Sequence, residues 1–393
     1  MLYDRKTGKS EELVGGRSPR GPDLWVGSFA WENGSRNNIY FAAEHEGLSL
    51  IYGVLFTPGV GGGIVWWPGA DGYADDVNIT QDGTTLLFTK MSLGHPIEIY
   101  RAPLQYVGLD RNEAGLRIEP VTHLNDALLS QVAMSPLESF WFPGADGDKV
   151  QGFLVKPPNF DPNKKYPVKF LIHGGPQGAW GDDWSYRWNP ELFAANGYVV
   201  VMINFHGSTG YGQKFIDAIN GDWGGAPFED LMKGLDYAEQ HYSFIDKDRE
   251  CALGASYGGY MANWILGHTN RFKCIVSHDG TFNTTAAWGT TEELWFPEWE
   301  LRGTPYTNRA MYDKWSPHLS ATNFKTPTLV VHSQLDYRLD VSEGFQLFTT
   351  LQRMGVPSKM LYFPDEGHWV LKPQNSQLWW KTVNDWVDEW VKK

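Results

Sequence analysis

The chain has 393 residues and a net charge of −13, from 33 basic and 46 acidic side chains. This acidic balance argues against nucleic acid as a main partner, because phosphate binding needs a basic face. The longest apolar stretches are far too short to cross a bilayer, and the first residues are polar. We therefore expect a globular protein of two domains, with no membrane partner and no visible signal peptide.

Residues 1–135 read as an all-β domain. Short alternating strands are separated by Gly, Asn and Asp turns. The stretch 31–54 also realigns with the stretch 79–102, so that Phe41 matches Phe88 at a shift of 47 and Tyr52 matches Tyr100 at a shift of 48. A period of this length with several strands per unit predicts β-propeller blades.

About 135 residues hold fewer than three blades, whereas closed propellers use about 4–8. We therefore expect a partial, incomplete propeller. Either the chain is a piece of a longer protein, or the open blade edges are covered by a partner, which makes a homo-oligomer through these edges an expectation. The compartment depends on the same choice: a complete chain would be cytoplasmic, and a fragment periplasmic or secreted.

From residue 136 the pattern changes to α/β, with residues 136–393 as one domain. A turn at Asp146-Gly147 precedes apolar strands that alternate with amphipathic helices, which is typical of a mostly parallel sheet covered on both faces. The expected strands are 168–172, 198–204, 251–255, 274–277, 328–332 and 359–363. The expected helices are 188–196, 213–220, 227–242, 257–268, 342–354 and 376–391.

The stretch GASYG at 254–258 joins an expected strand to an expected helix. Gly254 and Gly258 would relieve crowding in a tight turn that holds the Ser256 hydroxyl at the carboxyl edge of the sheet, which is the nucleophile elbow G-x-S-x-G. Taken alone the pentapeptide is also compatible with close helix–sheet packing and a serine N-cap. Further motifs are needed to distinguish a nucleophilic serine from a serine N-cap.

A nucleophilic serine needs a general base and a group that orients the base. Asp336 and His368 follow two later strands, in the chain order that an α/β-hydrolase requires. Both would therefore lie at the same sheet edge as Ser256. Asp340 and Asp365 are the alternative acids, and a surface histidine is the plain alternative for His368.

Acyl transfer also needs hydrogen-bond donors for an oxyanion. The backbone N–H of Tyr257, directly after the serine, is one candidate. The second is the loop His173-Gly174-Gly175-Pro176, which follows an earlier strand and whose glycines allow close backbone approach. A plain Gly-Pro turn is the other reading of this loop.

With these motifs together, the chain resembles the prolyl oligopeptidase family of serine peptidases, in its acylaminoacyl-peptidase and dipeptidyl-peptidase V branch. The matching stretches are HGGP (173–176), NFHGSTGYG (204–212), GDWGG (221–225), GASYGGYM (254–261), TTEELWFPEW (290–299), LDYRL (335–339) and DEGH (365–368). The resemblance implies an α/β-hydrolase domain after a β-propeller. It also implies the triad Ser256, Asp336 and His368, and an oxyanion hole at Gly175 and Tyr257.

The same resemblance implies that Arg338 binds a substrate carbonyl; a structural salt bridge is the alternative. Two positions depart from the family pattern. His206 stands where relatives have Arg, and Asp340 stands where Pro is common after the acid. His173 occupies the place of a tyrosine hydroxyl that prolyl oligopeptidases use in the oxyanion hole, so that device is absent here.

For substrate binding we expect a small or apolar pocket lined by Phe282, Trp288 and Trp295, which follow the strand after the elbow. Glu292 and Glu293 are candidates for binding a free substrate amine, with helix capping or a solvated surface role as the alternative for each. The leading hypothesis is a serine peptidase that hydrolyses short peptides and releases dipeptides or N-acyl amino acids. A carboxylesterase with the same triad and a non-catalytic interaction protein are the alternatives.

No cofactor and no metal are expected, because the chain lacks H-E-x-x-H and none of its 11 histidines pairs at ligand spacing. Two cysteines, Cys251 and Cys274, each lie in an expected strand. We predict that both are buried, reduced thiols, since a count of two excludes a disulfide framework.

Overall fold

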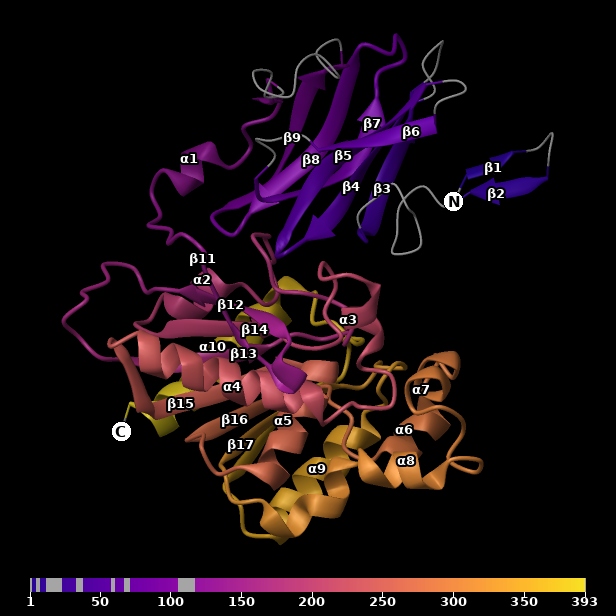
Figure 1. Ribbon diagram of the computed structural model, residues 1–393. Coiled ribbons are helices and arrows are strands. Elements are labelled where there is room, and N and C mark those ends of the chain that lie inside the picture. Colours follow the sequence, from indigo (N-terminus) through magenta and orange to yellow (C-terminus); the bar gives the residue numbers. More distant parts are fainter. Residues whose placement is uncertain are drawn as a thin grey trace. The chain divides into compact units, whose positions relative to one another are not determined.

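The computed structural model describes residues 2–4, 8–11, 23–32, 38–57, 61–66, 71–104 and 117–392 (Figure 1). They divide into two compact units. The first holds the described residues up to Pro136 together with Ala179–Tyr186 and Thr209–Ile216. The second holds Leu137–Gly178, Arg187–Ser208 and the chain from Asp217 onward. Two short excursions of the later chain thus belong to the first unit, which apolar patterning did not reveal.

The first unit is built from two antiparallel meanders of four strands each. Among the described residues their strands pair at Ser49 with Tyr73, and side-chain hydrogen bonds such as Val77 N–H to Ser28 Oγ at 2.9 Å also join them. The first meander has β3 (Trp25–Trp31), β4 (Ile39–His45), β5 (Leu48–Thr57) and β6 (Gly61–Trp66); the second has β7 (Tyr73–Ile79), β8 (Thr85–Ser92), β9 (His95–Pro103) and β10 (Glu119–Pro120). β1 (Leu2–Asp4) and β2 (Lys9–Glu11) form a separate pair, and the short helix α1 (Asp126–Leu129) follows β10.

The two meanders repeat each other as the sequence does. Phe41 on β4 lies opposite Tyr52 on β5 with stacked rings 5.4 Å apart, and Phe88 on β8 lies opposite Tyr100 on β9 with stacked rings 6.1 Å apart. The four aromatic residues are those that align at the 47–48-residue period; residues 33–37 of the first copy lie outside the described residues. Each copy is therefore one supersecondary unit, while its membership of a propeller stays a prediction.

The second unit is an eight-stranded sheet in the order β11-β12-β14-β13-β15-β16-β17-β18. Its strands from β14 to β18 run parallel, as the alternation of apolar strands and helices predicted, whereas β11 and β12 are antiparallel and connected at the Asp146-Gly147 turn. The bounds are β11 (Glu138–Pro143), β12 (Lys149–Val155), β13 (Tyr166–Ile172), β14 (Val199–Asn204), β15 (Ile245–Ala255), β16 (Cys274–His278), β17 (Thr328–Ser333) and β18 (Ser358–Phe363).

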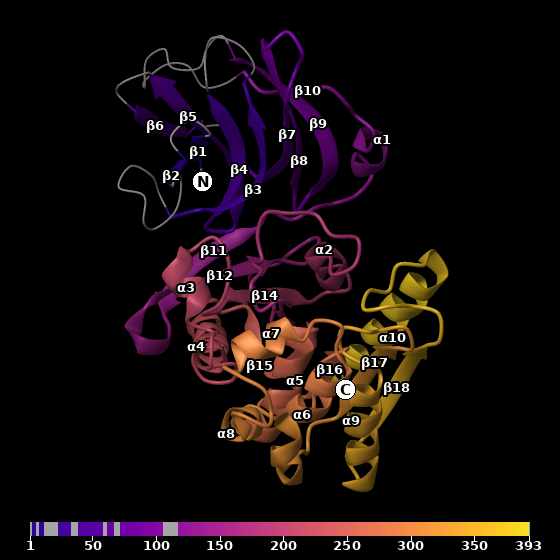
Figure 2. The same ribbon diagram turned by 90° about the vertical axis from the view of Figure 1, so that its right-hand side faces the viewer.

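Every residue of β14, β16 and β17 is buried, because helices cover both faces of the sheet. Helix α4 packs on β14, α5 on β15 and β16, and α10 on β15 and β16; Figure 2 shows α4 and α10 on opposite sides of the strands. The helices of this unit are α2 (Pro190–Ala194), α4 (Ala226–His241), α5 (Tyr257–His268), α6 (Thr284–Thr290), α7 (Trp295–Glu300), α8 (Arg309–Lys314), α9 (Ser342–Arg353) and α10 (Pro373–Val391), and α3 (Gln213–Asp217) crosses the boundary between the units.

Among the described residues, none of the helices combines the length and the apolarity that crossing a bilayer requires. Helix α10 buries Trp379, Val383 and Trp386 on one stripe, so the tryptophans there serve core packing. The expectation of two reduced thiols is wrong: Cys251 on β15 and Cys274 on β16 form a disulfide, with Cα atoms 4.9 Å apart. The two residues face each other in register on adjacent parallel strands, a proximity that chain distance conceals.

Candidate active site

The turn that carries Ser256 has the strained geometry of an elbow. Ser256 lies between β15 and α5 with φ 59° and ψ −120°, a backbone conformation that residues other than glycine rarely adopt. The flanking glycines are required by packing. A Cβ on Gly254 would collide with the carbonyl of Gly258, and a Cβ on Gly258 would collide with the carbonyl of Ile172. Close packing and a partly accessible serine are thus two results of the same turn.

The pair of Asp336 and His368 lies on two further loops at the carboxyl ends of β17 and β18. His368 Nδ1 lies 2.8 Å from Asp336 Oδ2. The other oxygen, Oδ1, accepts the N–H groups of Arg338 and Leu339 at 3.0 and 2.9 Å, which fixes the fully buried carboxylate. The imidazole is therefore oriented from its Nδ1 side, and Nε2 is the nitrogen left for a reacting group.

The alternative acids make other contacts. Asp340 accepts the N–H of Ser342 at the start of α9. Asp365 pairs with the ammonium of Lys372. Of the three aspartates considered from the sequence, the structure brings Asp336 to His368.

A second carboxylate, which sequence reasoning missed, joins the serine to the histidine. Asp279 follows β16; its Oδ1 accepts the Ser256 N–H at 2.7 Å, and its Oδ2 lies 3.6 Å from His368 Nδ1. Burial lowers the pKa of His368, but the charges of Asp279 and Asp336 outweigh burial and raise that pKa above 6.5. The ligand atoms of these two aspartates and His368 lie within 4.8 Å of one another, so a cation there would compete with Nδ1 for both carboxylates.

The glycine loop after β13 runs beside the serine. A Cβ placed on Gly174 would lie 3.3 Å from Ser256 Cβ and 3.9 Å from its Oγ. Gly175 has φ +117°, which glycine adopts without strain. Tyr257 is the first residue of α5, where backbone N–H groups have no partner within the helix. The loop and the helix start thus flank the hydroxyl, as an oxyanion hole would require.

His173 is held away from catalysis. Its Nε2 lies 2.9 Å from Ser208 Oγ, and its ring stacks on Phe205 with centroids 4.1 Å apart. Burial lowers the pKa of His173 to about 4, so the imidazole is neutral. His206, the first of the two departures from the family pattern, has its Nδ1 2.6 Å from the buried Asp230 on α4 and its Nε2 3.4 Å from Asp148.

Glu300, on α7, links the end of the glycine loop to the GDWGG stretch. Its carboxylate accepts Gln177 Nε2 at 2.6 Å and Trp223 Nε1 at 2.9 Å, and the Tyr257 hydroxyl donates to the Trp223 carbonyl at 2.5 Å. Burial raises the pKa of Glu300. A glutamate on a helix beyond the site thereby holds the glycine loop and the helix that carry the expected oxyanion donors.

Arg338 is engaged by acidic neighbours. Its Nη2 lies 3.0 Å from Glu293 Oε1 and 3.6 Å from Glu292 Oε1, and its guanidinium lies 5.9 Å from the centre of the Trp369 ring. The side chain is 37% exposed. Arg338 and the two candidate amine-binding glutamates therefore form one cluster next to the loop of Asp336.

The expected pocket residues lie on one segment but in different surroundings. Phe282 is buried against His318 and Phe324, whereas Trp295 is 67% exposed. The indole N–H of Trp288 donates to Glu298 at 3.2 Å. None of the ring contacts among the described residues joins two of these three aromatic side chains, so the pocket stays a prediction.

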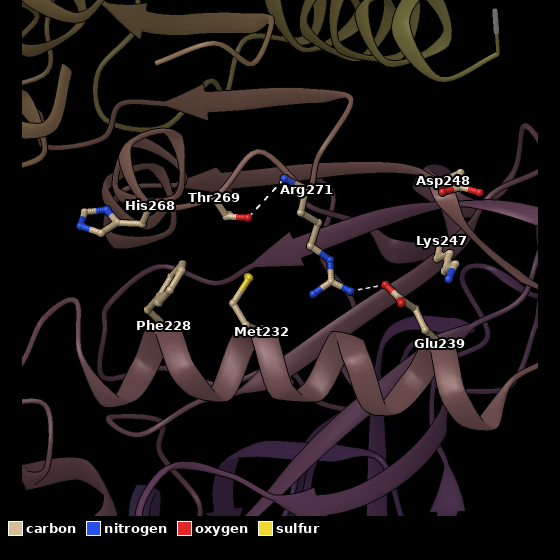
Figure 3. A pocket seen from close by; sticks show the side chains of 8 residues that line it. All are labelled: Phe228, Met232, Glu239, Lys247, Asp248, His268, Thr269 and Arg271. Carbon is tan, nitrogen blue, oxygen red and sulfur yellow. Dashed lines mark hydrogen bonds and ion pairs between the residues drawn. The ribbon is translucent and has the colours of Figure 1, made fainter. Parts of the chain in front are cut away.

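A separate hollow of about 610 Å³ lies at the opposite, amino end of the parallel strands (Figure 3). Arg271 faces it, and the guanidinium is held by Glu250, Asp236 and Glu239. Three carboxylates therefore surround one guanidinium, and this local excess of negative charge disfavours an anionic ligand. The hollow is lined by Phe228, Met232, Glu239, Lys247, Asp248, His268, Thr269 and Arg271.

Comparison with known proteins agrees with the architecture. The chain is 49% identical over 278 residues to dipeptidyl-peptidase 5 of Schizosaccharomyces pombe, which covers 69% of the chain and 41% of the relative. Dipeptidyl-peptidase 5 of Trichophyton equinum is 49% identical over 271 residues, with 68% and 37% covered. The chain thus spans about two fifths of the length of these relatives.

Solved structures share the fold. An uncomplexed acylaminoacyl peptidase of Pyrococcus horikoshii matches with a TM-score of 0.81 and 24% identity, over 94% of the chain and 57% of that protein. Dipeptidyl peptidase 4 of Porphyromonas gingivalis matches with a TM-score of 0.79 and 18% identity, over 99% of the chain and 52% of that protein. The second unit accordingly has the α/β-hydrolase fold. Residues 184–393 match the prolyl oligopeptidase family, and the chain belongs to that family.

Proposed function

We propose that the chain is a serine peptidase that forms an acyl-enzyme on Ser256. One observation carries this proposal: Asp279 links the backbone of a strained elbow serine to the imidazole of His368, which is hydrogen-bonded to Asp336. A hydroxyl at such a turn becomes a nucleophile when a neutral base removes its proton. His368 is the base that the neighbouring contacts favour.

In the proposed reaction, Ser256 Oγ attacks the scissile carbonyl carbon while its proton passes to His368 Nε2. The carbonyl oxygen becomes an oxyanion that the N–H groups of Gly175 and Tyr257 stabilise. The C–N bond then breaks, and His368 gives the proton to the leaving amine. A water molecule releases the acyl group by the same steps, and Asp336 stabilises the imidazolium throughout.

The proposed substrates are short peptides. The names of the curated relatives, dipeptidyl-peptidase 5, support release of dipeptides. The solved acylaminoacyl peptidases support release of N-acyl amino acids. We propose a small or apolar side chain at the cleaved residue, near Phe282, Trp288 and Trp295, with Arg338 beside the peptide backbone.

We also propose that the two meanders of the first unit are β-propeller blades. β3, at one end of the strand order, exposes Trp25, Phe29 and Trp31 to 46, 66 and 42%. Exposed apolar faces mark interaction sites, so we propose that this chain self-associates through β3. Size-exclusion chromatography with light scattering tests it: Phe29→Ser should lower the apparent mass, and a monomeric parent chain would refute self-association.

Covalent labelling with a fluorophosphonate tests the proposed nucleophile. The parent chain should react once and lose its hydrolytic activity, and Ser256→Ala should neither react nor hydrolyse substrate. Ser139→Ala, which removes an exposed hydroxyl from the edge strand β11, is the matched control and should react like the parent. Turnover by Ser256→Ala above background would overturn the assignment.

A rate comparison on three chromogenic substrates tests the substrate class. A free dipeptide anilide should be cleaved fastest if dipeptides are released, and an N-acylated amino-acid anilide if acyl amino acids are. Hydrolysis of a short-chain ester with neither anilide cleaved would favour the carboxylesterase alternative. A strong preference for Lys or Arg at the cleaved residue would contradict the apolar pocket.

A further inference from the structure

Asp279 is a buried carboxylate that the triad leaves without a role. It is the first residue after β16, only 2% exposed, and has φ +40°, a left-handed conformation that few residues other than glycine adopt. Its own N–H donates to the carbonyl of Val331 on β17 at 2.9 Å. A buried charge in a strained backbone persists only where the surroundings hold it firmly.

The two carboxylate oxygens of Asp279 face different parts of the site. Oδ1 accepts the N–H of Ser256 at 2.7 Å. The His278 carbonyl accepts the same N–H at 3.0 Å. Oδ2 lies 3.6 Å from His368 Nδ1 and 3.3 Å from His278 Nε2. One side chain therefore touches the backbone of the nucleophile and the ring of the base.

The sheet order explains why both aspartates reach one histidine. Asp279 follows β16 and Asp336 follows the neighbouring parallel strand β17, so both carboxylates emerge at the same edge. His368 follows β18, the next strand. Its Nδ1 lies 2.8 Å from Asp336 and 3.6 Å from Asp279, so the nearer aspartate accepts the hydrogen bond and the farther one adds a charge.

The loop of Asp279 is clamped from behind. Glu343 on α9, fully buried, accepts the N–H groups of Phe282 and Asn283 at 2.7 Å each. A Cβ on Gly280 would collide with the backbone of Gly259 in α5. The carboxylate of Asp279 is thus fixed against the start of α5.

We infer that Asp279 is a positioning residue that holds the Ser256 backbone at the elbow and supplies a second negative charge to the His368 imidazolium. This inference rests on the proposed serine peptidase function. It implies that the base is served by two carboxylates, with Asp336 orienting the ring and Asp279 acting on charge and on the serine backbone.

Electrostatics of the surroundings agree with a charged Asp279. Burial alone would raise the pKa of Asp279, but the neighbouring histidines and the Ser256 N–H hold that pKa below its ordinary range. Both aspartates raise the pKa of His368, whereas the charge of Arg338 lowers the pKa of His368. The titratable and charged groups around this pair of aspartates are His278, His332, His368, Arg187 and Arg338.

The test uses Asp279→Asn, which keeps an oxygen for the Ser256 N–H and removes the charge. The acidic limb of kcat/KM should move to lower pH by about one pH unit or more, because a carboxylate 3.6 Å away no longer favours the imidazolium. The KM at the pH optimum should stay unchanged. Asp385→Asn, which removes an exposed charge from α10, is the control and should leave the limb in place.

A double-mutant cycle separates a charge on the base from a merely structural role. In serine proteases where one aspartate serves the histidine, its replacement by Asn lowers kcat by roughly 10⁴-fold. Here Asp336→Asn alone should lower kcat by less than this factor, and the double variant Asp279→Asn/Asp336→Asn should lower kcat by roughly 10⁴-fold. The effect of Asp279→Asn should thus be at least about tenfold larger in the Asp336→Asn background than in the parent. Equal effects in both backgrounds, or an unmoved acidic limb, would overturn the inference.

Failure of the proposed function would look different. In that case the parent chain would neither label with fluorophosphonate nor hydrolyse the three substrates, before any variant is compared. If the parent does label, its labelling rate should fall as the pH is lowered. The rate for Asp279→Asn should fall less, because His368 in that variant stays neutral to lower pH. Identical pH dependence of labelling in the two proteins would again refute the role of Asp279.

Discussion

Lys169 is a charged side chain in the centre of the sheet, and its replacement by Met gives a sharp test of the fold. It lies on β13 with no exposed surface, and its Nζ contacts the Phe193 carbonyl at 2.9 Å and Asn384 Oδ1 at 2.6 Å. Among the described residues no carboxylate forms an ion pair with it. Burial lowers the pKa of Lys169 from 10.5 to about 7, despite the opposing charge of Asp388.

Proton binding by Lys169 sets the direction in which the free energy of unfolding changes with pH. Between the folded pKa of about 7 and the unfolded value of 10.5, the unfolded chain holds the Lys169 proton and the folded chain does not. The free energy of unfolding therefore rises with pH across this window. One pKa unit corresponds to about 1.4 kcal/mol, so the contribution of Lys169 grows by about 2 kcal/mol between about pH 7 and pH 9.

Urea unfolding followed by tryptophan fluorescence measures the effect. The free energy of unfolding of the parent should increase from pH 7 to pH 9 by about 2 kcal/mol more than that of Lys169→Met, because groups other than Lys169 cancel in the comparison. Lys164→Met, at a side chain 70% exposed, is the matched control and should behave as the parent. Coinciding pH slopes for the parent and Lys169→Met would refute the assignment of a neutral buried lysine.

Three shorter predictions concern the site and the disulfide. Gly175→Ala should lower kcat by roughly 10²–10³-fold, because a Cβ there would meet the backbone of Gln177 and displace an oxyanion donor. Gly197→Ala carries a similar left-handed backbone strain, with φ +90°, but its Cβ would meet no neighbouring atom, so this control should leave kcat unchanged. The kcat/KM should rise with pH through a midpoint above 6.5, since His368 must be neutral to act as a base and its pKa is raised; a midpoint below 6.5 would contradict this. Denatured, unreduced chain should show no free thiols to Ellman's reagent and two after reduction, whereas two without reductant would exclude the disulfide.

Some parts of the fold could be predicted because their signals are local. The apolar runs at 168–172, 251–255 and 328–332 lie within the observed β13, β15 and β17, since a strand buried on both faces needs an unbroken apolar run. Pro373 begins α10 three residues earlier than the periodicity indicated, because proline suits the first turn of a helix. Helices α6, α7 and α8 were not predicted, since each is only six or seven residues long.

The candidate site likewise has parts that local sequence signals predict and parts that depend on contacts between distant segments. The elbow at Ser256 and the positions of Asp336 and His368 after strands could be predicted, because glycines and strand ends are local features of the chain. The contact of Asp279 with this site and the disulfide between Cys251 and Cys274 become visible only in the folded sheet. These contacts depend on which strands are neighbours and in what register, and the packing of the whole sheet sets both.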